Sequence, residues 1–293
     1  MLWRCLAACF VALAAPASAQ SSLAEQRALW NRPLEPFRII GNVYYVGTAS
    51  IASYLVTDGA GHVLIDGGME ESAPQIAANI RRLGFRLEDV RVLLINHAHW
   101  DHAGGLAELK RLSGARLVAS AADSGDLERG FNADRGDTAR FAPVAVDRHI
   151  EEGARVRSGG VELTAHLTPG HTRGCTSWTM RAYEGGRGFD LLFACSLTVA
   201  GRNLVDDQGY REAARDFEGS FARLRTIPAD IFLGFHASHF GLDERRRRLL
   251  AGDALAFVDP GEARRRIDSA YAEFRAEWDR QRAPAAAATA PTP

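Results

Sequence analysis

The chain has 293 residues, of which 46% are hydrophobic and 24% are charged, and its formal net charge at pH 7 is −1. This composition is ordinary for a globular protein, and the length does not require more than one domain. The near-neutral charge excludes a general nucleic-acid-binding protein, which needs a strongly basic face. We therefore expect no nucleic-acid partner.

The N-terminal segment has the pattern of a secretory signal peptide. Arg4 supplies a positive charge, residues 5–14 form a short apolar stretch, and Ala17-Ser18-Ala19 is a cleavage site of the A-x-A type. The apolar stretch is shorter than the roughly 20 residues that a transmembrane helix needs. We expect residues 1–19 to be removed, and the mature protein to be periplasmic without stable membrane insertion.

Lipidation is an alternative interpretation of the same segment. Leu6-Ala7-Ala8-Cys9 has the form of a lipobox. Cys9 lies so close to Arg4 that almost no apolar stretch would separate them, so cleavage after residue 19 is favoured.

The mature chain is predicted to contain one folded domain and one tail. Residues 20–282 have a mixed pattern of strands and helices and are predicted to form the domain. Residues 283–293 are rich in Ala, Pro and Thr, a composition typical of a disordered segment.

The first half of the domain begins with short strands separated by Gly, Asp and Thr residues. A later run, residues 90–95, is apolar except for Arg91, which is typical of a strand buried on both faces. The strands expected in this half are 37–40, 43–46, 51–56, 63–66, 90–95 and 117–119, and the helices are 73–83 and 102–112.

The second half repeats this mixture of strands and helices. The expected strands are 161–167, 176–182, 191–195 and 231–234, and the expected helical segments are 212–224 and 244–278. Two mixed halves of this kind fit two sheets packed face to face with helices outside. The predicted fold class is α/β, with four layers in the order αββα.

Residue types that bind metals are concentrated directly after the buried strand. The segment reads His97-Ala98-His99-Trp100-Asp101-His102. Side chains two residues apart on extended backbone project to the same side, so His97 and His99 can share one metal. The following helix redirects Asp101 and His102 to a neighbouring point. Imidazole and carboxylate ligands together favour zinc over magnesium or calcium.

The alternative interpretation is a surface loop whose histidines bind no metal. A single histidine would favour that interpretation. Four ligand-type residues within six positions after a buried strand favour a metal site instead.

This segment resembles the H-x-H-x-D-H signature of the metallo-β-lactamase superfamily. The resemblance extends from about residue 43 to 239 and includes the segments 64–68, 168–172 and 234–236. It implies the αββα fold of that superfamily and two zinc ions per chain. The first zinc would be held by His97, His99 and His171, and the second by Asp101, His102 and His236. Asp66 is expected to organise its loop rather than to bind metal.

The remaining histidines are expected to be structural or on the surface. His239 is an alternative to His236, but the strand predicted over 231–234 leads directly into His236, which we therefore favour. No ligand-type partners lie near His62, His149 or His166 in the sequence.

The end of the strand over 191–195 distinguishes branches of the superfamily. Members similar to glyoxalase II and the lactonases place a metal-bridging Asp there, and β-lactamases of subclasses B1 and B2 use a Cys ligand. Here the residues are Ala194-Cys195-Ser196-Leu197, and together with His102 they resemble subclass B3. That resemblance implies that Ser196 and Thr198 bind a zinc-bound water or the substrate carboxylate.

The implied reaction is hydrolysis of the amide bond of a small-molecule β-lactam. A hydroxide bridging two zinc ions would attack the carbonyl carbon, and Asp101 would orient that hydroxide. One alternative is an exported zinc lactonase or thioesterase of the same superfamily. Another is a zinc-binding protein without catalysis, which three protein ligands per metal disfavour. The sequence predicts neither the preferred β-lactam nor the oligomeric state.

Two cysteines remain after removal of the leader. Cys175 and Cys195 flank a predicted strand-turn-strand segment, so a hairpin could bring them together in an oxidising compartment. We expect a disulfide. The alternatives are two buried free thiols, or Cys195 as a zinc ligand with Cys175 reduced.

Overall fold

The computed structural model describes residues 22–133 and 139–283. The predicted signal peptide (1–19), the lipobox cysteine Cys9 and all but the first residue of the predicted tail lie outside the described residues. None of the described helices combines the length and the apolar character needed to cross a membrane.

The first sheet has seven strands within the described residues, and they follow one another in chain order. Neighbouring strands are antiparallel from the first to the fourth and parallel from the fourth to the seventh. The strands are β1 (Phe37–Ile40), β2 (Val43–Tyr45), β3 (Tyr54–Val56), β4 (His62–Ile65), β5 (Val90–Leu94), β6 (Arg116–Ser120) and β7 (Arg148–Ile150).

The second sheet has five strands within the described residues, in the order β12-β11-β10-β9-β8. The β11–β12 pair is parallel, and the other pairs are antiparallel. The strands are β8 (Arg155–Ser158), β9 (Val161–Leu167), β10 (Thr176–Glu184), β11 (Arg187–Phe193) and β12 (Ile231–Leu233).

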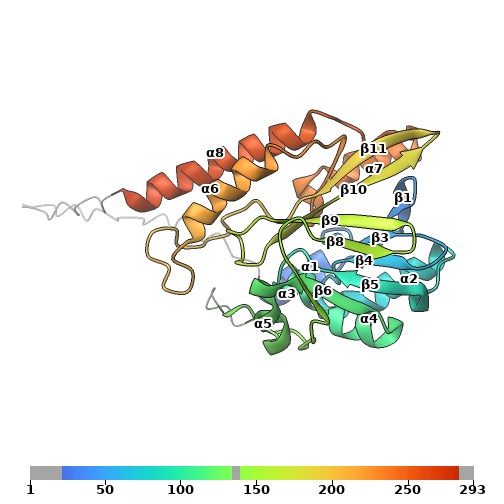
Figure 1. Ribbon diagram of the computed structural model, residues 1–293, viewed down its shortest axis with the longest axis horizontal. Helices are drawn as coiled ribbons and strands as arrows, with labels where there is room; N and C mark the ends of the chain where they lie inside the picture. The colour runs from blue at the N-terminus through green and yellow to red at the C-terminus, as the bar shows by residue number, and fades with distance from the viewer. Residues whose placement is uncertain (1–21, 134–138, 284–293) are drawn as a thin grey trace, which may run out of the picture.

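Helices cover the outer faces of both sheets, as Figure 1 shows. The first sheet is flanked by α1 (Leu23–Trp30), α2 (Ala73–Arg82), α3 (Trp100–Ala103), α4 (Leu106–Ser113) and α5 (Ala121–Arg129). On the opposite side lie α6 (Ala213–Leu224), α7 (Leu242–Leu250) and α8 (Glu262–Arg282). Short 3-10 helices are η1 (Glu70–Ser72), η2 (Leu87–Asp89) and η4 (Ala237–His239). The predicted α/β architecture of two sheets with helices outside is confirmed.

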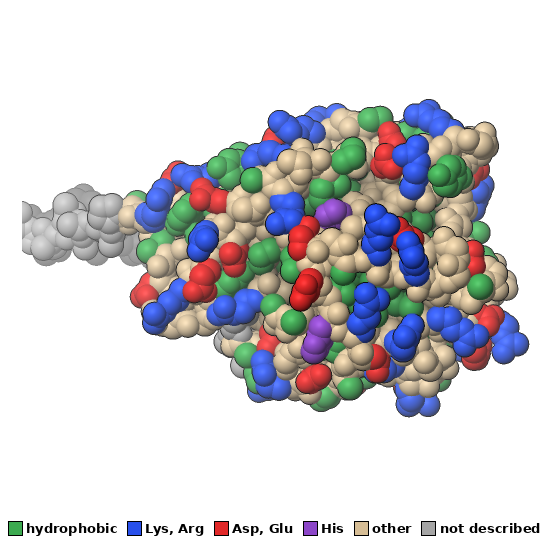
Figure 2. Space-filling view, in the orientation of Figure 1, with side chains coloured by type: hydrophobic (Ala, Val, Ile, Leu, Met, Phe, Trp, Pro, Cys, Tyr) green, Lys and Arg blue, Asp and Glu red, His purple; other side chains and the backbone are tan. Residues whose placement is uncertain are grey.

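The core between the sheets is built from large apolar side chains. Trp178, Tyr45 and Tyr54 are fully buried there. The ring of Tyr54 in β3 lies 5.1 Å from that of Phe193 in β11 in an edge-to-face arrangement, so it links the two sheets. Burial of this area from water stabilises the sandwich and fixes where the strand ends meet. On the face that Figure 2 shows, basic and acidic side chains are intermixed.

Two predicted helices are each divided in the structure. The helix expected over 102–112 is α3 followed by α4, and the break falls at Gly104 and Gly105. A Cβ on Gly105 would lie 2.2 Å from the carbonyl oxygen of Gly67, so tertiary contact with the β4 loop fixes this turn. The segment expected to be helical over 244–278 is α7 and α8, separated by residues 251–261. Pro260 lies in that connection and cannot donate a backbone hydrogen bond.

Candidate metal centre

The motif segment lies at the carboxyl end of β5, where parallel strands of the first sheet end together. His97 and His99 lie on the loop after the strand, and His99 has extended backbone (φ −94°, ψ 153°) as the residue before α3. α3 then carries Asp101 and His102 on its first turn. Ligand-type side chains at such a strand edge are typical of functional sites on a rigid scaffold.

Three imidazoles meet in what we call the first cluster, His97, His99 and His171. The Nδ1 atom of His99 lies 3.0 Å from Nε2 of His97 and 3.1 Å from Nε2 of His171. All three residues are buried. His171 comes from the loop after β9, so the second sheet supplies the third nitrogen.

A carboxylate and two imidazoles meet in the second cluster, Asp101, His102 and His236. Oδ2 of Asp101 lies 3.4 Å from Nε2 of His102 and 3.3 Å from Nε2 of His236. The two imidazole Nε2 atoms are 3.3 Å apart. The His236 side chain is 21% exposed, so this cluster reaches solvent.

Both clusters fit a tetrahedral zinc ion. Zinc bonds of ~2.0–2.1 Å place neighbouring ligand atoms of a tetrahedron about 3.3–3.4 Å apart. The three edges of the second cluster are 3.3, 3.3 and 3.4 Å, and two edges of the first are 3.0 and 3.1 Å. Three protein atoms per cluster leave the fourth position of each tetrahedron for water or substrate, which is typical of catalytic rather than structural zinc.

Metal ligands must be neutral imidazoles and ionised carboxylates. Burial and then the neighbouring imidazoles lower the pKa of His97. Burial raises the pKa of Asp101, but His102 and His236 outweigh it, so the pKa is lowered overall and the carboxylate stays ionised. For His102, burial lowers the pKa, but the neighbouring carboxylates of Asp101 and Asp66 raise it by more, so the pKa is raised overall. Two of these three groups are therefore already in the protonation state that binds zinc.

In three of the five cluster histidines, the ring nitrogen that faces away from the cluster has a partner of its own. His171 Nδ1 lies 2.7 Å from the carbonyl oxygen of Thr198, and His102 Nδ1 lies 3.0 Å from Oδ2 of Asp66. His97 Nδ1 contacts the side-chain oxygen of Asn96. Such partners fix the tautomer and the orientation of a ligating imidazole.

Asp66 lies behind His102 and not among the atoms of the second cluster. It is fully buried, has a positive φ of 65°, and accepts the backbone N–H of Asn96 at 2.8 Å. Burial raises the pKa of Asp66 to about 6, and hydrogen bonds from His102 and Asn96 oppose that rise. The carboxylate thus joins the β4 loop to the motif segment, in the role that the sequence predicts for it.

The other histidines lie outside both clusters. The ring centroid of His239 is 5.0 Å from that of His236, but His239 is not among the atoms that meet Asp101. Burial lowers the pKa of His239 to about 4. Nδ1 of His62 accepts the backbone N–H of Asp58. His149 lies in β7, and His166 contacts Thr179.

Cys175 and Cys195 form a disulfide, with Cα atoms 5.9 Å apart. The prediction of a disulfide is confirmed, and the alternatives of free thiols and of Cys195 as a zinc ligand are wrong for this structure. The antiparallel pairing of β10 and β11 brings the start of β10, beside Cys175, close to the end of β11, beside Cys195, as the sequence predicts for a hairpin. Sγ of Cys195 lies 3.8 Å from Nδ1 of His97, so the bridge lies directly behind the first cluster.

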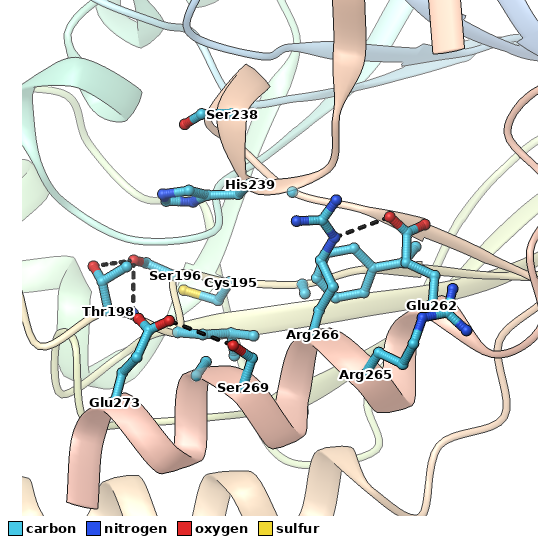
Figure 3. A pocket seen from close by; sticks show the side chains of 15 residues that line it. Cys195, Ser196, Thr198, Ser238, His239, Glu262, Arg265, Arg266, Ser269 and Glu273 are labelled. Carbon is cyan, nitrogen blue, oxygen red and sulfur yellow. Dashed lines mark hydrogen bonds and ion pairs between the residues drawn. The ribbon is translucent and has the colours of Figure 1, made fainter. Parts of the chain in front are cut away.

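Ser196 and Thr198 border a pocket of about 420 Å³, which adjoins the clusters through His239, beside His236, and Cys195, beside His97. Oγ of Ser196 lies 3.1 Å from Oγ1 of Thr198. Figure 3 shows His239 across this pocket from α8, which contributes charged side chains to its floor. These are Glu262, Arg265, Arg266 and Glu273. The pocket offers hydroxyl groups and both signs of charge next to the candidate metal centre.

The sequence did not predict the helix α1 that lies against the second cluster. Trp30 at its end stacks on Trp100 of the motif with ring centroids 5.7 Å apart, and lies edge-on to His236 at 5.2 Å. A sequence signal was present, because Ser22 and Glu25 form a capping box. Asp123, a buried carboxylate described below, was also not predicted.

Comparison with known proteins places this geometry in a family. A family model described as "Metallo-beta-lactamase superfamily" matches residues 46–182. A solved metallo-β-lactamase of Cronobacter sakazakii is 41% identical, with a TM-score of 0.85, and the match covers 88% of this chain and 100% of that one. A subclass B3 metallo-β-lactamase of Bradyrhizobium japonicum is 38% identical, with a TM-score of 0.83, covering 88% and 98%.

Curated relatives are similar over a shorter region. A hydroxyacylglutathione hydrolase of Rhodopseudomonas palustris is 35% identical over 119 residues, which is 41% of this chain. The match spans only 39% of that relative, so the chain covers about two fifths of its length. A human persulfide dioxygenase is 32% identical over 124 residues, 42% of this chain and 39% of that protein.

The fold, the two clusters and the full-length matches define a metal-dependent hydrolase. The chain belongs to the metallo-β-lactamase superfamily and, within it, is similar to subclass B3. The superfamily is typically zinc-dependent, in agreement with the donor sets found here. The Cronobacter sakazakii protein is described by a HARLDQ motif, whereas the segment in this chain has histidines at its third and sixth positions, His99 and His102.

Proposed function

We propose that this protein is an exported zinc β-lactamase that holds two metal ions. The observation that carries the proposal is the pairing of two three-ligand clusters with Ser196, which follows the end of β11 by three residues. A glyoxalase II-like site would be expected to have a bridging Asp at that strand end. A subclass B1 or B2 site would have a Cys ligand, but Cys195 is in a disulfide.

In the proposed centre, His97, His99 and His171 hold one zinc, and Asp101, His102 and His236 hold the other. Bound zinc lowers the pKa of a coordinated water and polarises the carbonyl group of the substrate. The Asp101 carboxylate accepts a hydrogen bond from the attacking water and so orients it. The hydroxyls of Ser196 and Thr198 donate to the substrate carboxylate. No protein side chain forms a covalent acyl-enzyme in this reaction.

The reaction requires room for a bicyclic substrate beside the metals. The pocket between Thr198, His239 and α8 adjoins the metal centre through His239, without being lined by the six ligand residues, and would receive the part of the substrate that extends away from the metals. Trp30 and Trp100 form an apolar wall on the side of His236. An apolar face and a few hydroxyl groups suit a small, partly apolar anion.

A lactonase or thioesterase is the second candidate. The observation that favours it is the similarity to hydroxyacylglutathione hydrolases over 119 residues. Because the same pair of zinc ions can activate water against an ester, a thioester or an amide, the substrate must be identified by assay.

Substrate profiling of the mature protein tests the proposal. A chromogenic cephalosporin, a penicillin, a carbapenem, a lactone and a thioester would be assayed with and without a chelator. We expect β-lactam hydrolysis that the chelator abolishes and that inhibitors trapping a serine acyl-enzyme leave unchanged. Turnover of the lactone or the thioester with no β-lactam hydrolysis would instead support the second candidate.

Metal analysis and cell fractionation test the other parts of the proposal. Mature protein should bind two zinc ions per chain at saturation. Full activity with a single bound zinc would contradict the two-metal centre. The full-length protein should be recovered in the periplasmic fraction, and a variant that lacks residues 1–19 should remain in the cytoplasm.

A further inference from the structure

We propose that Asp123 is a positioning residue for the metal of the first cluster. Its carboxylate joins the two loops that supply all three imidazoles of that cluster. The proposal rests on the first cluster being a metal site and does not depend on which substrate is hydrolysed.

The contacts of Asp123 reach both loops. Oδ2 accepts the backbone N–H of Ala98 at 2.9 Å, and Ala98 lies between His97 and His99. The same oxygen accepts the hydroxyl of Thr172, the residue after His171, at 3.1 Å. Oδ1 accepts the backbone N–H of Gly174 at 2.9 Å. One side chain therefore fixes the distance between the motif loop and the His171 loop.

The surrounding structure holds Asp123 in this place. It lies in the first turn of α5 and is buried. Ser120, the residue that caps α5, accepts the backbone N–H of Asp123 and donates its hydroxyl to the carbonyl oxygen of Gly174 at 2.9 Å. A Cβ on Gly174 would lie 2.1 Å from the Ser120 hydroxyl and 2.5 Å from the Asp123 carboxyl carbon. Only glycine permits this close approach of the loop to the helix.

The second cluster has a different carboxylate behind it. Asp66 supports His102, whereas the hydrogen bonds of Asp123 go to Ala98, Thr172 and Gly174. Partners of this kind behind metal ligands affect metal affinity because they fix where the ligand atoms lie. Loss of the Asp123 carboxylate should therefore weaken the first metal site selectively.

Asparagine is an informative replacement because it keeps the size and removes one acceptor. Its amide has one oxygen, which accepts hydrogen bonds, and one NH₂ group, which only donates them. The NH₂ group must therefore face the backbone N–H of either Ala98 or Gly174, and two donors cannot form a hydrogen bond. One of the two loops then loses its anchor, and the buried N–H is left without its carboxylate partner. Glutamate would keep the charge but push the loops apart.

The chain offers a matched control on the same helix. Asp126 is also a buried carboxylate of α5. It pairs with Arg129 at 2.5 Å and accepts the side-chain amide of Asn132 at 2.7 Å and the backbone N–H of Ala133 at 3.3 Å. None of these partners lies on a loop that carries a metal ligand. Asp126→Asn should therefore destabilise the fold without a direct effect on the clusters.

The test measures zinc affinity by competition with a chromogenic chelator, one cluster at a time. His236→Ala leaves the first cluster intact, and His171→Ala leaves the second. In the His236→Ala background, Asp123→Asn should weaken the remaining zinc by roughly 10–100-fold, the range typical for partners behind metal ligands. In the His171→Ala background it should change zinc affinity by less than about threefold, and Asp126→Asn should change affinity little in either.

The outcomes separate this inference from the proposed function. Equal losses of affinity in both backgrounds, or equal losses for Asp123→Asn and Asp126→Asn, would overturn the positioning role. Absence of zinc binding by the wild-type protein would overturn the proposed function itself. If Asp123→Asn does not fold, Thr172→Val removes one of the same hydrogen bonds. It should weaken first-cluster zinc severalfold, and Thr172→Ser should restore it; no loss in Thr172→Val would count against the proposal.

Discussion

The two metal clusters have the same arrangement along the chain but differ in the types of their ligands and in their exposure. Each takes two ligands from the segment 97–102 and one histidine from a distant loop. The first cluster has three buried imidazoles. The second has one carboxylate, and its distant histidine is partly exposed beside Trp30. The first cluster is therefore a buried set of neutral ligands. The second cluster is a partly exposed set that carries one negative charge.

The backbone of the motif explains how one short segment can serve two metals. Extended backbone points His97 and His99 to one side, and the start of α3 turns Asp101 and His102 to the other. Each half of the motif then has its own buried carboxylate behind it, Asp123 for the first half and Asp66 for the second. We therefore expect the two sites to respond separately to substitution.

Loss of one distant histidine should have the largest effect. His171→Ala and His236→Ala should each lower hydrolysis by more than the ~10–100-fold typical of partners that do not touch metal. Each variant should keep the metal of the other cluster. Metal content after dialysis and the absorption spectrum of the cobalt-substituted protein check this, and loss of both metals from either variant would show that the clusters are one coupled site.

Replacement of the carboxylate behind the second cluster should have the next largest effect. Asp66→Asn should weaken zinc at the second cluster by roughly 10–100-fold, because asparagine offers His102 Nδ1 at best a neutral oxygen in place of the carboxylate that fixes its tautomer. Zinc at the first cluster should be retained. Chelator competition in the His171→Ala background measures the second site alone, and an unchanged affinity there would contradict the role given to Asp66.

Removal of the disulfide should affect stability more than chemistry. The double variant Cys175→Ser, Cys195→Ser should be destabilised by roughly 3 kcal/mol, the value expected for a loop of this size. Denaturant unfolding measures the change. Because the bridge lies behind His97, any loss of zinc should fall on the first cluster; a selective loss at the second would be inconsistent with this geometry.

The smallest effect is expected for the histidine outside both clusters. His239→Ala should lower hydrolysis by less than about tenfold, below the loss expected from first-cluster or second-cluster ligands. His239 lines the pocket, so the change should appear in KM rather than in zinc content. A metal-depleted His239→Ala protein beside a fully loaded His236→Ala protein would reverse the assignment of the last ligand.

The sequence predicted most of the site because its signals are local. The spacing of His97, His99, Asp101 and His102 is visible in six residues, and β5 is recognised by its apolar run. For Cys175 and Cys195 the sequence left three alternatives: a disulfide, two free thiols, or Cys195 as a zinc ligand. The register of β10 and β11, which brings the two residues together, was needed to choose among them.

The parts that the sequence did not predict depend on tertiary contacts. The break between α3 and α4 follows from the approach of Gly105 to Gly67, which periodicity along one helix does not reveal. In the sequence, Asp123 cannot be distinguished from any other acidic residue in the first turn of a helix. Its role depends on hydrogen bonds to Ala98 and Gly174, which only the tertiary fold brings close to it. Strands β7 and β8, of three and four residues, are too short to give a clear pattern.

The stacking of Trp30 on Trp100, with His236 at its edge, bears on the order of assembly. These residues come from the beginning, the middle and the last strand region of the chain, so the second cluster is among the most non-local contacts of the fold. Non-local contacts form late in folding, because the entropy of closing a long loop must be lost before the contacts can stabilise the chain. Zinc capture at the second cluster should therefore mark the last step of maturation. A chain halted before β12 contains all three residues of the first cluster but lacks His236. It should therefore be able to load only the first metal and should remain inactive.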